Sequence, residues 1–364
     1  MIVAMRKSEQ NGQEIYRHSA KLVAMTSVEY YRRYPDIVER YGPQGRRRTD
    51  EDIHYHYQTL AEAMIAEESN MFLRYVAWVK SVLVNRKVRG DYLVDCLLIM
   101  QEVITDVLGG AIAEVASSYI ELALDSFDSF AELPPSCIDS ASTLSNLANG
   151  YLEALLSSDL ERAREVLRSA ERSGLSFKDV CEYVLQPVQR EVGRLWQVNQ
   201  ITVAQEHYST ASTERLMAEF EPPASSRHAK EDQHFFVGAC VAGEQHSIGL
   251  RVISECLETS GWRVYFTGAN TPSASLTDLV RRGNVNVIGL SCATVLNLPA
   301  LRQLVTQIRQ CPKPTRIMVG GRIFNEFPSL WKKVGADAYA EDATSAMRVA
   351  EKLVGAQRAS AVKG

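Results

Sequence analysis

The sequence predicts a protein of three domains, two of them all-helical and the last an α/β domain built on a doubly wound parallel sheet. Apolar residues recur with helical spacing over the first 221 residues, whereas five short apolar runs alternate with amphipathic helices after residue 234. Polar stretches that contain proline separate the three blocks. We expect the domains to span residues 1–135, 141–221 and 234–357, which suits a chain of 364 residues.

Long helices are expected in the first domain. Residues 17–41 are amphipathic, and the acidic residues after Thr49 predict the start of a helix that continues to about Asn85. Another apolar-periodic stretch covers residues 91–124. Two prolines and a polar run over residues 134–142 then indicate a linker.

The second domain is predicted to be a bundle of four helices over residues 141–221. Asp159, or Ser158 before it, suits the N-terminus of one helix, and Ser176 suits the next. A short break at residues 199–200 separates the last two helices.

The third domain follows a polar stretch, residues 222–233, that we interpret as a linker. The predicted strands cover residues 234–242, 263–268, 285–292, 315–319 and 336–340. In a parallel sheet of this kind, ligands bind beyond the carboxyl ends of the strands.

Composition excludes several classes of function. The formal net charge of −4 and the lack of a compact basic helix in the first 133 residues argue against direct DNA binding. No apolar run approaches the roughly 20 residues that span a membrane, and the N-terminus lacks the pattern of a signal peptide, so we expect a cytoplasmic protein. The seven cysteines form no C-x-x-C pair, which argues against a zinc site or a disulfide framework.

A histidine motif follows the first predicted strand. His246 lies at the carboxyl edge of the sheet, where its imidazole can donate a lone pair to a metal. Glu244, two residues earlier, can accept the proton of the other ring nitrogen and so fix the tautomer. Gly249 lets the next helix approach closely because it has no Cβ.

Two later loops lie at the same edge. Ser291 and Thr294 follow the third strand and offer two hydroxyls, while Gly320 and Gly321 follow the fourth strand. We expect the paired glycines to leave a slot beside the sheet that admits a flat ring.

These three loops resemble the cobalamin-binding domain shared by methionine synthase, B12-dependent mutases and B12 photoreceptors. The family pattern D-x-H-x-x-G, then S-x-T or S-x-L, then G-G, appears here as E-Q-H-S-I-G, Ser291 with Thr294, and Gly320-Gly321. The resemblance implies that His246 replaces the dimethylbenzimidazole base under cobalt, that this base enters the glycine slot, and that the two hydroxyls bind the nucleotide tail. Glu244 departs from the usual Asp by one methylene.

The helical domain ahead of the sheet carries a second pattern. Val203, Glu206 and His207 lie at i, i+3 and i+4 on one helix face, and Trp196 precedes them. The spacing W-x9-E-H is similar to the cap bundle of light-sensing B12 proteins of the CarH/LitR type. That resemblance implies adenosylcobalamin as the cofactor, with these four residues around the adenosyl group. Gln197 stands where some of these photoreceptors have a histidine after the tryptophan, so no bis-histidine light product is expected through that position.

From this resemblance we expect a light-sensing regulatory protein rather than an enzyme, with homo-oligomers and a downstream partner that the sequence does not name. Breaking of the Co–C bond would repack the cap bundle and change domain or oligomer contacts. The alternative is a corrinoid methyl carrier for a methyltransferase system, although those proteins continue the histidine motif as G-K-N and here Gly249 is followed by Leu250 and Arg251. A mutase subunit would need a barrel, and no βα repeats precede residue 222.

The first domain leaves two interpretations. Its many aromatic residues and long helices indicate a globin-like domain for dimerisation or signalling. Its place in the chain also resembles photocobilins, in which a helical domain that holds a bilin is joined to a B12 photoreceptor unit. Biliverdin or another bilin would then bind non-covalently, because Cys96 lies within an apolar helix. His54 and His56 are two residues apart and fall on nearly opposite sides of a helix.

Overall fold

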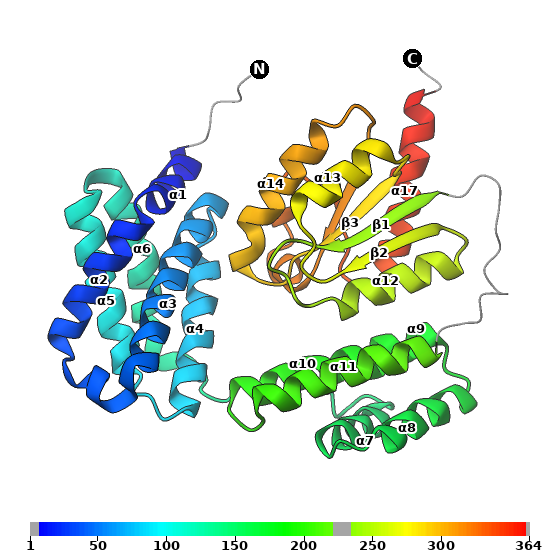
Figure 1. Ribbon diagram of the computed structural model, residues 1–364, viewed down its shortest axis with the longest axis horizontal. Helices are drawn as coiled ribbons and strands as arrows, with labels where there is room; N and C mark the ends of the chain where they lie inside the picture. Colours follow the sequence, from blue (N-terminus) through cyan, green and yellow to red (C-terminus); the bar gives the residue numbers. More distant parts are fainter. Residues whose placement is uncertain (1–6, 221–233, 362–364) are drawn as a thin grey trace. The chain divides into compact units, whose positions relative to one another are not determined.

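The computed structural model describes residues 7–220 and 234–361, so the linker predicted at residues 222–233 lies outside the described part of the chain. The chain divides into two units (Figure 1). The first comprises Met1–Pro135 with Gln197–Gln200, and the second comprises Ser136–Trp196 with Ile201–Gly364.

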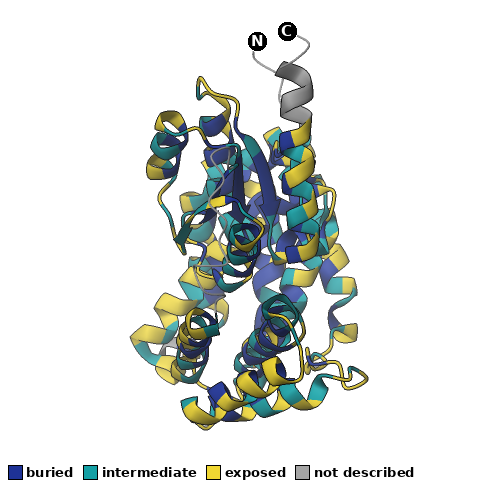
Figure 2. Cartoon of the chain, turned by 90° about the vertical axis from the view of Figure 1, so that its right-hand side faces the viewer, coloured by how far each residue is buried: buried dark blue, intermediate teal, exposed yellow. Residues whose placement is uncertain are grey.

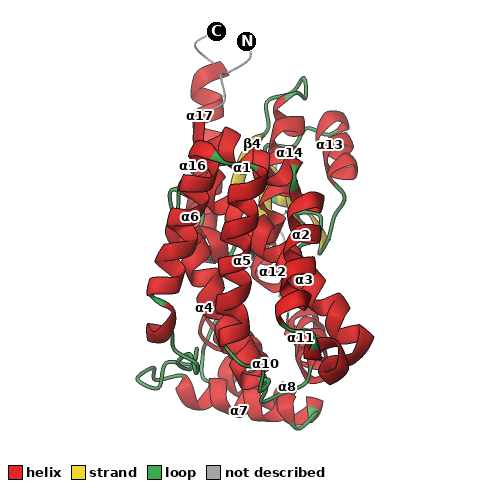
Figure 3. Cartoon of the chain, turned by 90° about the vertical axis from the view of Figure 1, so that its left-hand side faces the viewer, coloured by secondary structure: helices red, strands yellow, loops and turns green. Residues whose placement is uncertain are grey.

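The first unit is helical throughout its described elements (Figure 3). Its helices are α1 (Lys7–Arg17), α2 (Ser19–Arg33), α3 (Asp36–Ala66), α4 (Ser69–Asn85), α5 (Asp91–Val107) and α6 (Gly110–Asp125), followed by the short 3₁₀ turn η1 (Phe127–Ser129).

The predicted helix boundaries in this unit were partly wrong. Residues 17–41 fall into three helices rather than one, and Thr49 lies inside α3, where its hydroxyl donates to the Gly45 carbonyl (3.1 Å). The true interruption is a kink at Gly42, whose φ of 65° is available to glycine and which precedes Pro43.

Two further breaks divide stretches that the sequence pattern joined. Glu67 adopts a left-handed conformation (φ 50°) and ends α3, so the predicted helix to Asn85 is two helices. Gly109 and Gly110, with φ of 55° and 51°, separate α5 from α6. Each break sits within apolar periodicity, which is why the pattern alone did not reveal it.

His56 is buried in the core of the first unit, with 3% of its surface exposed, whereas His54 is exposed. Its Nδ1 forms a hydrogen bond with the Tyr75 hydroxyl (2.8 Å), and burial lowers its pKa to about 4. One turn earlier on α3, loss of water around the carboxyl and the neighbouring Glu51 raise the pKa of Asp52 to about 6. Because its pKa is about 4, the His56 imidazole is neutral at physiological pH.

The second unit begins with the predicted four-helix bundle. Its elements are α7 (Ser145–Leu156), α8 (Leu160–Arg172), a continuous helix made of α9 (Phe177–Val180), η2 (Cys181–Leu185) and α10 (Gln186–Gln197), and α11 (Val203–Phe220). Asp159 accepts a hydrogen bond from the Arg162 N–H (2.9 Å), and Ser176 forms a capping box with Asp179. Both predicted helix starts are confirmed.

A π-helical turn, η2, interrupts the middle helix of the bundle. The Gln186 N–H donates to the Cys181 carbonyl, five residues back, rather than four. Pro187 follows directly and has no N–H to offer the Tyr183 carbonyl, so regular α-helical bonding cannot pass this point.

The α/β part contains five parallel strands, as predicted. They are β1 (Phe235–Cys240), β2 (Arg263–Gly268), β3 (Val287–Ser291), β4 (Arg316–Gly320) and β5 (Ala338–Tyr339), in the order β2-β1-β3-β4-β5. This is the flavodoxin-like order. All residues of β1 and β3 are buried, and the strands at the centre of the sheet are dark blue in Figure 2.

Helices cover the sheet and connect its strands: α12 (Ile248–Thr259), α13 (Ser273–Arg282), α14 (Leu298–Arg309), α15 (Arg322–Glu326), α16 (Leu330–Lys333) and α17 (Ala343–Ala361). Val252 and Cys256 of α12 and Ala343 of α17 belong to the same hydrophobic core as the bundle. The bundle and the sheet domain therefore share buried apolar surface within the second unit.

Candidate cofactor site

The carboxyl ends of β1, β3 and β4 meet at one edge of the sheet. Cys240 pairs with Ser291, and Ser291 pairs with Gly320, so the three loops that follow these strands start side by side. This register brings the predicted loops together at the edge where parallel sheets bind ligands.

A tight turn carries the chain from β1 into the histidine loop. Gly243 has a φ of 85°, and a Cβ there would lie 2.9 Å from Asn297 Oδ1. The Asn270 side chain accepts the Gly243 N–H (2.8 Å), and the Asn270 N–H donates to the Glu244 carbonyl (2.8 Å). The loop is thus held from two other loops of the sheet edge.

Glu244 is fully buried, and four donors converge on its carboxylate. Oε1 accepts from His246 Nδ1 (2.5 Å) and from the His246 N–H (2.9 Å), while Oε2 accepts from the Ala293 N–H (2.5 Å) and Asn297 Nδ2 (3.0 Å). Burial opposes ionisation, but the hydrogen bonds and the nearby imidazole outweigh it and lower the pKa of Glu244 to about 2. The extra methylene relative to Asp does not prevent close contact with His246.

The His246 ring is fixed through one nitrogen and open at the other. Its hydrogen bond to Glu244 raises the pKa of His246, which burial alone would lower. The side chain is 69% exposed, and within the described chain Nε2 has no hydrogen-bond partner. An imidazole whose Nδ1 is held by a carboxylate presents Nε2 as a metal ligand.

The loop after β3 places the two predicted hydroxyls at the same edge. Ser291 is 8% exposed and sits at the last position of the strand, while Thr294 is half-buried. The Thr294 carbonyl accepts from the Asn297 N–H (3.3 Å), and no described group bonds its hydroxyl. The Thr294 hydroxyl is therefore available to a ligand.

The structure changes the reasons given for two of the glycines. Beyond its chain neighbours and its own helix backbone, no atom lies within 4 Å of a Cβ built at Gly249, so this position is open rather than packed against another element. At Gly321, where φ is 108°, a Cβ would lie 2.3 Å from the Cys292 carbonyl oxygen. A Cβ at Gly320 would lie 3.0 Å from the Ala340 carbonyl oxygen. The paired glycines therefore permit close contact with neighbouring backbone, in addition to any slot they leave.

On the bundle side, Val203 and His207 of α11 are exposed, and Glu206 is about three-quarters buried. His207 Nδ1 contacts Glu206 Oε2 (2.5 Å), and Glu206 Oε1 accepts from the Thr210 hydroxyl (3.1 Å). Trp196 is half-buried at the end of α10 and packs against the bundle core. Glu206 also raises the pKa of His246, behind the larger effect of Glu244 and the opposing effect of Arg322. Helix α11 contacts the histidine loop directly through the Ser247 hydroxyl, which donates to Glu214 Oε1 (2.7 Å).

Sequence reasoning missed three groups that hold the site together. Asn270 and Asn297 brace the histidine loop, and the Ala293 N–H completes the shell of Glu244. Asn270 has a φ of 48°, and asparagine at the end of a strand is a residue type that adopts this conformation, which is the signal that could have identified it.

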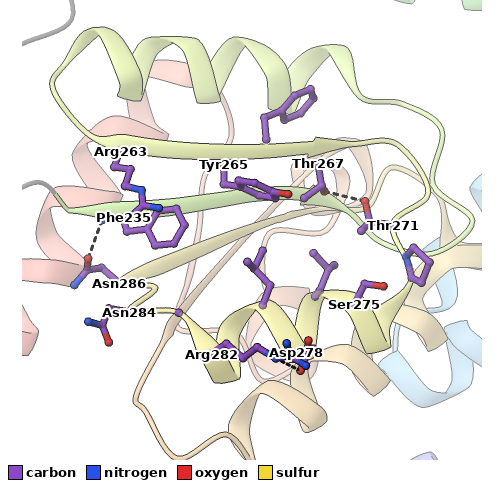
Figure 4. Close-up of a pocket in the computed structure, with 15 residues that line it drawn as sticks. Phe235, Arg263, Tyr265, Thr267, Thr271, Ser275, Asp278, Arg282, Asn284 and Asn286 are labelled. Carbon is purple, nitrogen blue, oxygen red and sulfur yellow. Dashed lines mark hydrogen bonds and ion pairs between the residues drawn. The ribbon is translucent and has the colours of Figure 1, made fainter. Parts of the chain in front are cut away.

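A groove of about 1080 Å³ lies elsewhere, between β2 and α13 (Figure 4). Tyr265 and Arg263 of the edge strand face it, and across it Arg282 is paired with Asp278 (2.9 Å). It includes none of the predicted site residues. Across the described residues there is no group of three or more His, Cys, Asp or Glu that could hold a bare metal ion, and no helix long and apolar enough to cross a membrane.

Two segments of the chain match known domain models. Residues 236–349 match a model described as a B12 binding domain, and residues 147–221 match a second model with the same description. The chain is therefore a cobalamin-binding protein, in which a helical B12-binding cap precedes an α/β B12-binding domain.

Its relatives include two kinds of protein. Dimethylamine corrinoid protein 1 of Methanosarcina acetivorans is 29% identical over 121 residues, which cover 32% of this chain and 55% of that protein. The HTH-type transcriptional repressor CarA of Myxococcus xanthus is 26% identical over 177 residues, which cover 49% of this chain and 58% of that protein. These matches span a little over half of each relative. The solved structure of the Methanosarcina barkeri monomethylamine corrinoid protein aligns over 58% of this chain with a TM-score of 0.49 and 18% identity.

The residues at the sheet edge fit a corrinoid. His246 offers an exposed Nε2 whose partner nitrogen is fixed, Gly249 leaves open space beside it, and the Thr294 hydroxyl is available for a polar group of the ligand. His246 would hold cobalt, and Glu244 would keep the imidazole in the ligating tautomer.

Proposed function

We propose that this chain is a light-sensing regulatory protein that binds adenosylcobalamin between the histidine loop of the sheet and helix α11 of the cap. The observation that carries the proposal is the contact between the histidine loop and α11, in which the Ser247 hydroxyl donates to Glu214 Oε1 (2.7 Å). The loop carries His246, fixed by Glu244, and the same helix carries the Glu206–His207 pair. The cofactor supplies a cobalt–carbon bond that breaks when the corrin absorbs light.

The cap residues translate that event into a change of packing. With the adenosyl group in place, Trp196, Val203, Glu206 and His207 are expected to surround it. Val203 is 52% exposed and the His207 side chain 75% exposed, so both are available to a ligand. Without that group, this face of α11 would lack those contacts, and the cap would be free to repack against the sheet or against a second copy of the chain.

Regulation rather than catalysis is favoured by the surroundings of the site. Two pairs of ionisable groups hold one another, Glu244 with His246 at the sheet edge and Glu206 with His207 on the cap helix α11. Neither pair is left as an acid and a base facing a substrate. The similarity to the repressor CarA is consistent with a regulatory role.

The test is an absorption spectrum of the full chain after addition of adenosylcobalamin in darkness, repeated after green light. We expect uptake in the dark, a spectral change in light, and a light-dependent change in oligomer size by size-exclusion chromatography. His246→Ala should abolish stable uptake. A variant that takes up the cofactor with unchanged colour would refute the proposed lower ligand.

A corrinoid methyl carrier is the second candidate, because the dimethylamine corrinoid proteins match the same sheet domain. The two functions differ in cofactor and response. A carrier would be expected to retain methylcobalamin and to transfer its methyl group to a methyltransferase partner, without a light-dependent change in oligomer size.

We also propose that the N-terminal helices hold a bilin non-covalently. Tyr75 stacks on Trp78 with ring centroids 6.3 Å apart and bonds His56, which gives an aromatic and polar cluster suited to a planar chromophore. Cys96 is 4% exposed, and burial raises its pKa to about 12, so a reactive thiolate is not expected there. Addition of biliverdin should produce an absorbance band in the red, and its absence would leave a dimerisation or signalling domain.

A further inference from the structure

The hydroxyl of Ser247, the residue after His246, bonds a residue of the cap and not the helix that Ser247 precedes. It occupies the N-cap position of α12, where a serine hydroxyl ordinarily accepts a hydrogen bond from the first turn of the helix. Here it makes no such bond and instead donates to Glu214 Oε1 of the cap helix α11 (2.7 Å). Ser247 is 6% exposed, so the contact is shielded from water.

Glu214 belongs to the same stripe of α11 as the cap residues already described. Glu206, Thr210 and Glu214 are four residues apart and lie one above the other on the helix. The Thr210 hydroxyl bonds Glu206 (3.1 Å) at one end of the stripe, and Glu214 bonds Ser247 at the other. One helix therefore carries both Glu206 and the carboxylate that bonds Ser247, the residue next to His246 in sequence.

We propose that Glu214 is a positioning residue, which through its hydrogen bond with Ser247 holds the cap helix in register with the cobalt-binding loop. The inference deepens the proposed function, since it rests on cobalamin lying between α11 and this loop. A shift of α11 would be passed directly to Ser247 and to the start of α12, and so to the backbone that carries His246.

The chain offers a matched control for this contact. Lys178 Nζ of α9 donates to the Thr344 hydroxyl of α17 (2.9 Å), which also joins the bundle to the sheet domain. Lys178 lies on α9 and Thr344 on the first turn of α17, so neither belongs to the loops that follow β1, β3 and β4. If the Glu214–Ser247 hydrogen bond only holds the bundle against the sheet domain, its loss and the loss of the Lys178–Thr344 hydrogen bond should affect the histidine loop equally.

The first experiment uses the full chain without cofactor. Hydrogen exchange of backbone amides would be followed in residues 203–220 and 244–250 for Ser247→Ala, Glu214→Ala and Lys178→Met. We expect both site variants to raise exchange in both segments by about tenfold to a hundredfold, as the loss of a shielded hydrogen bond to a carboxylate should. Lys178→Met should leave these segments unchanged, and Ser247→Thr, which keeps the hydroxyl, should behave as the parent chain.

The second experiment measures release of adenosylcobalamin in darkness. Ser247→Ala should release it at least about tenfold faster while keeping the spectrum of the histidine-ligated cofactor. An equal effect of Lys178→Met, or faster exchange confined to α12, would overturn the inference. The light response of the parent chain is a separate result: its absence would remove the proposed function and leave the dark measurements on Glu214 valid.

Discussion

Glu244→Gln tests the reasoning about the site most directly, because it preserves shape and removes charge. Four donors point at the Glu244 carboxylate, two at each oxygen. A glutamine has one oxygen and one NH₂ group, so the NH₂ group faces at least one backbone donor whichever way the amide turns. If it turns towards His246, it meets the His246 N–H, and the imidazole can accept from it only in the tautomer that protonates Nε2, the nitrogen needed for a metal. If the NH₂ group turns away from His246, it meets the Ala293 N–H and Asn297 Nδ2.

The expected cost follows from these contacts. A buried donor left without a partner costs about 1–3 kcal/mol, so one or two of them should lower the free energy of unfolding by about 1–6 kcal/mol. Loss of a carboxylate that orients a metal-binding histidine typically weakens metal binding by about 10–100-fold, equivalent to about 1.4–2.8 kcal/mol. Both losses should appear in the same variant.

Cobalamin binding would be measured by absorbance titration in darkness, alongside thermal unfolding of the cofactor-free chain. Asp337→Asn is the matched control, since Asp337 accepts from the Ile317 N–H (2.7 Å) and Arg309 (2.9 Å) at the amino ends of the strands. It should reduce stability and leave cobalamin affinity within about threefold of the parent chain. Unchanged affinity in Glu244→Gln would refute the role assigned to the carboxylate.

Two further variants test other parts of the structure. Gly321→Ala places a methyl group 2.3 Å from the Cys292 carbonyl oxygen at a φ of 108° and should lower the free energy of unfolding by about 2–4 kcal/mol, with loss of cobalamin uptake; an unaltered melting temperature would contradict this. The pKa of His56 is about 4 when folded and 6.5 when unfolded, so the unfolded chain binds the proton first and His56 removes about 2 kcal/mol of stability between pH 7 and about pH 5. His56→Gln should lack this acid-dependent loss of stability, measured by hydrogen exchange in α3 and α4 corrected for intrinsic rates. Asp52, whose pKa is raised to about 6, makes a contribution to stability that grows as the pH falls, and it does so equally in the parent chain and the variant. If the parent chain and the variant respond equally to acid, the buried histidine is not the cause.

The sheet was predictable from the sequence because its central strands, β1 and β3, are buried on both faces. Such strands appear as short uninterrupted apolar runs, and both ends of all five strands were predicted to within two residues. The register then follows from topology, which is why His246, Ser291 and Gly320 could be placed at one edge before their contacts were known.

The parts of the site that the sequence did not predict depend on contacts between segments far apart in the chain. Asn297 reaches Glu244 across 53 residues, and Glu214 reaches Ser247 from another domain across 33, which no local pattern encodes. The helix breaks at Gly42 and Gly109 escaped detection for a different reason, since a glycine with positive φ leaves the apolar periodicity on both sides intact.

The π turn ahead of Pro187 has a consequence for any comparison of this cap with another. Because η2 takes in one residue more than an α-helical turn, everything after it is rotated by about 100° from where an unbroken helical wheel would put it. Trp196 lies on that later stretch. The side of the helix on which the Trp196 indole lies therefore depends on the π turn ahead of Pro187, nine residues earlier. An alignment that ignores the extra residue of this turn would assign the indole to the wrong side of the helix.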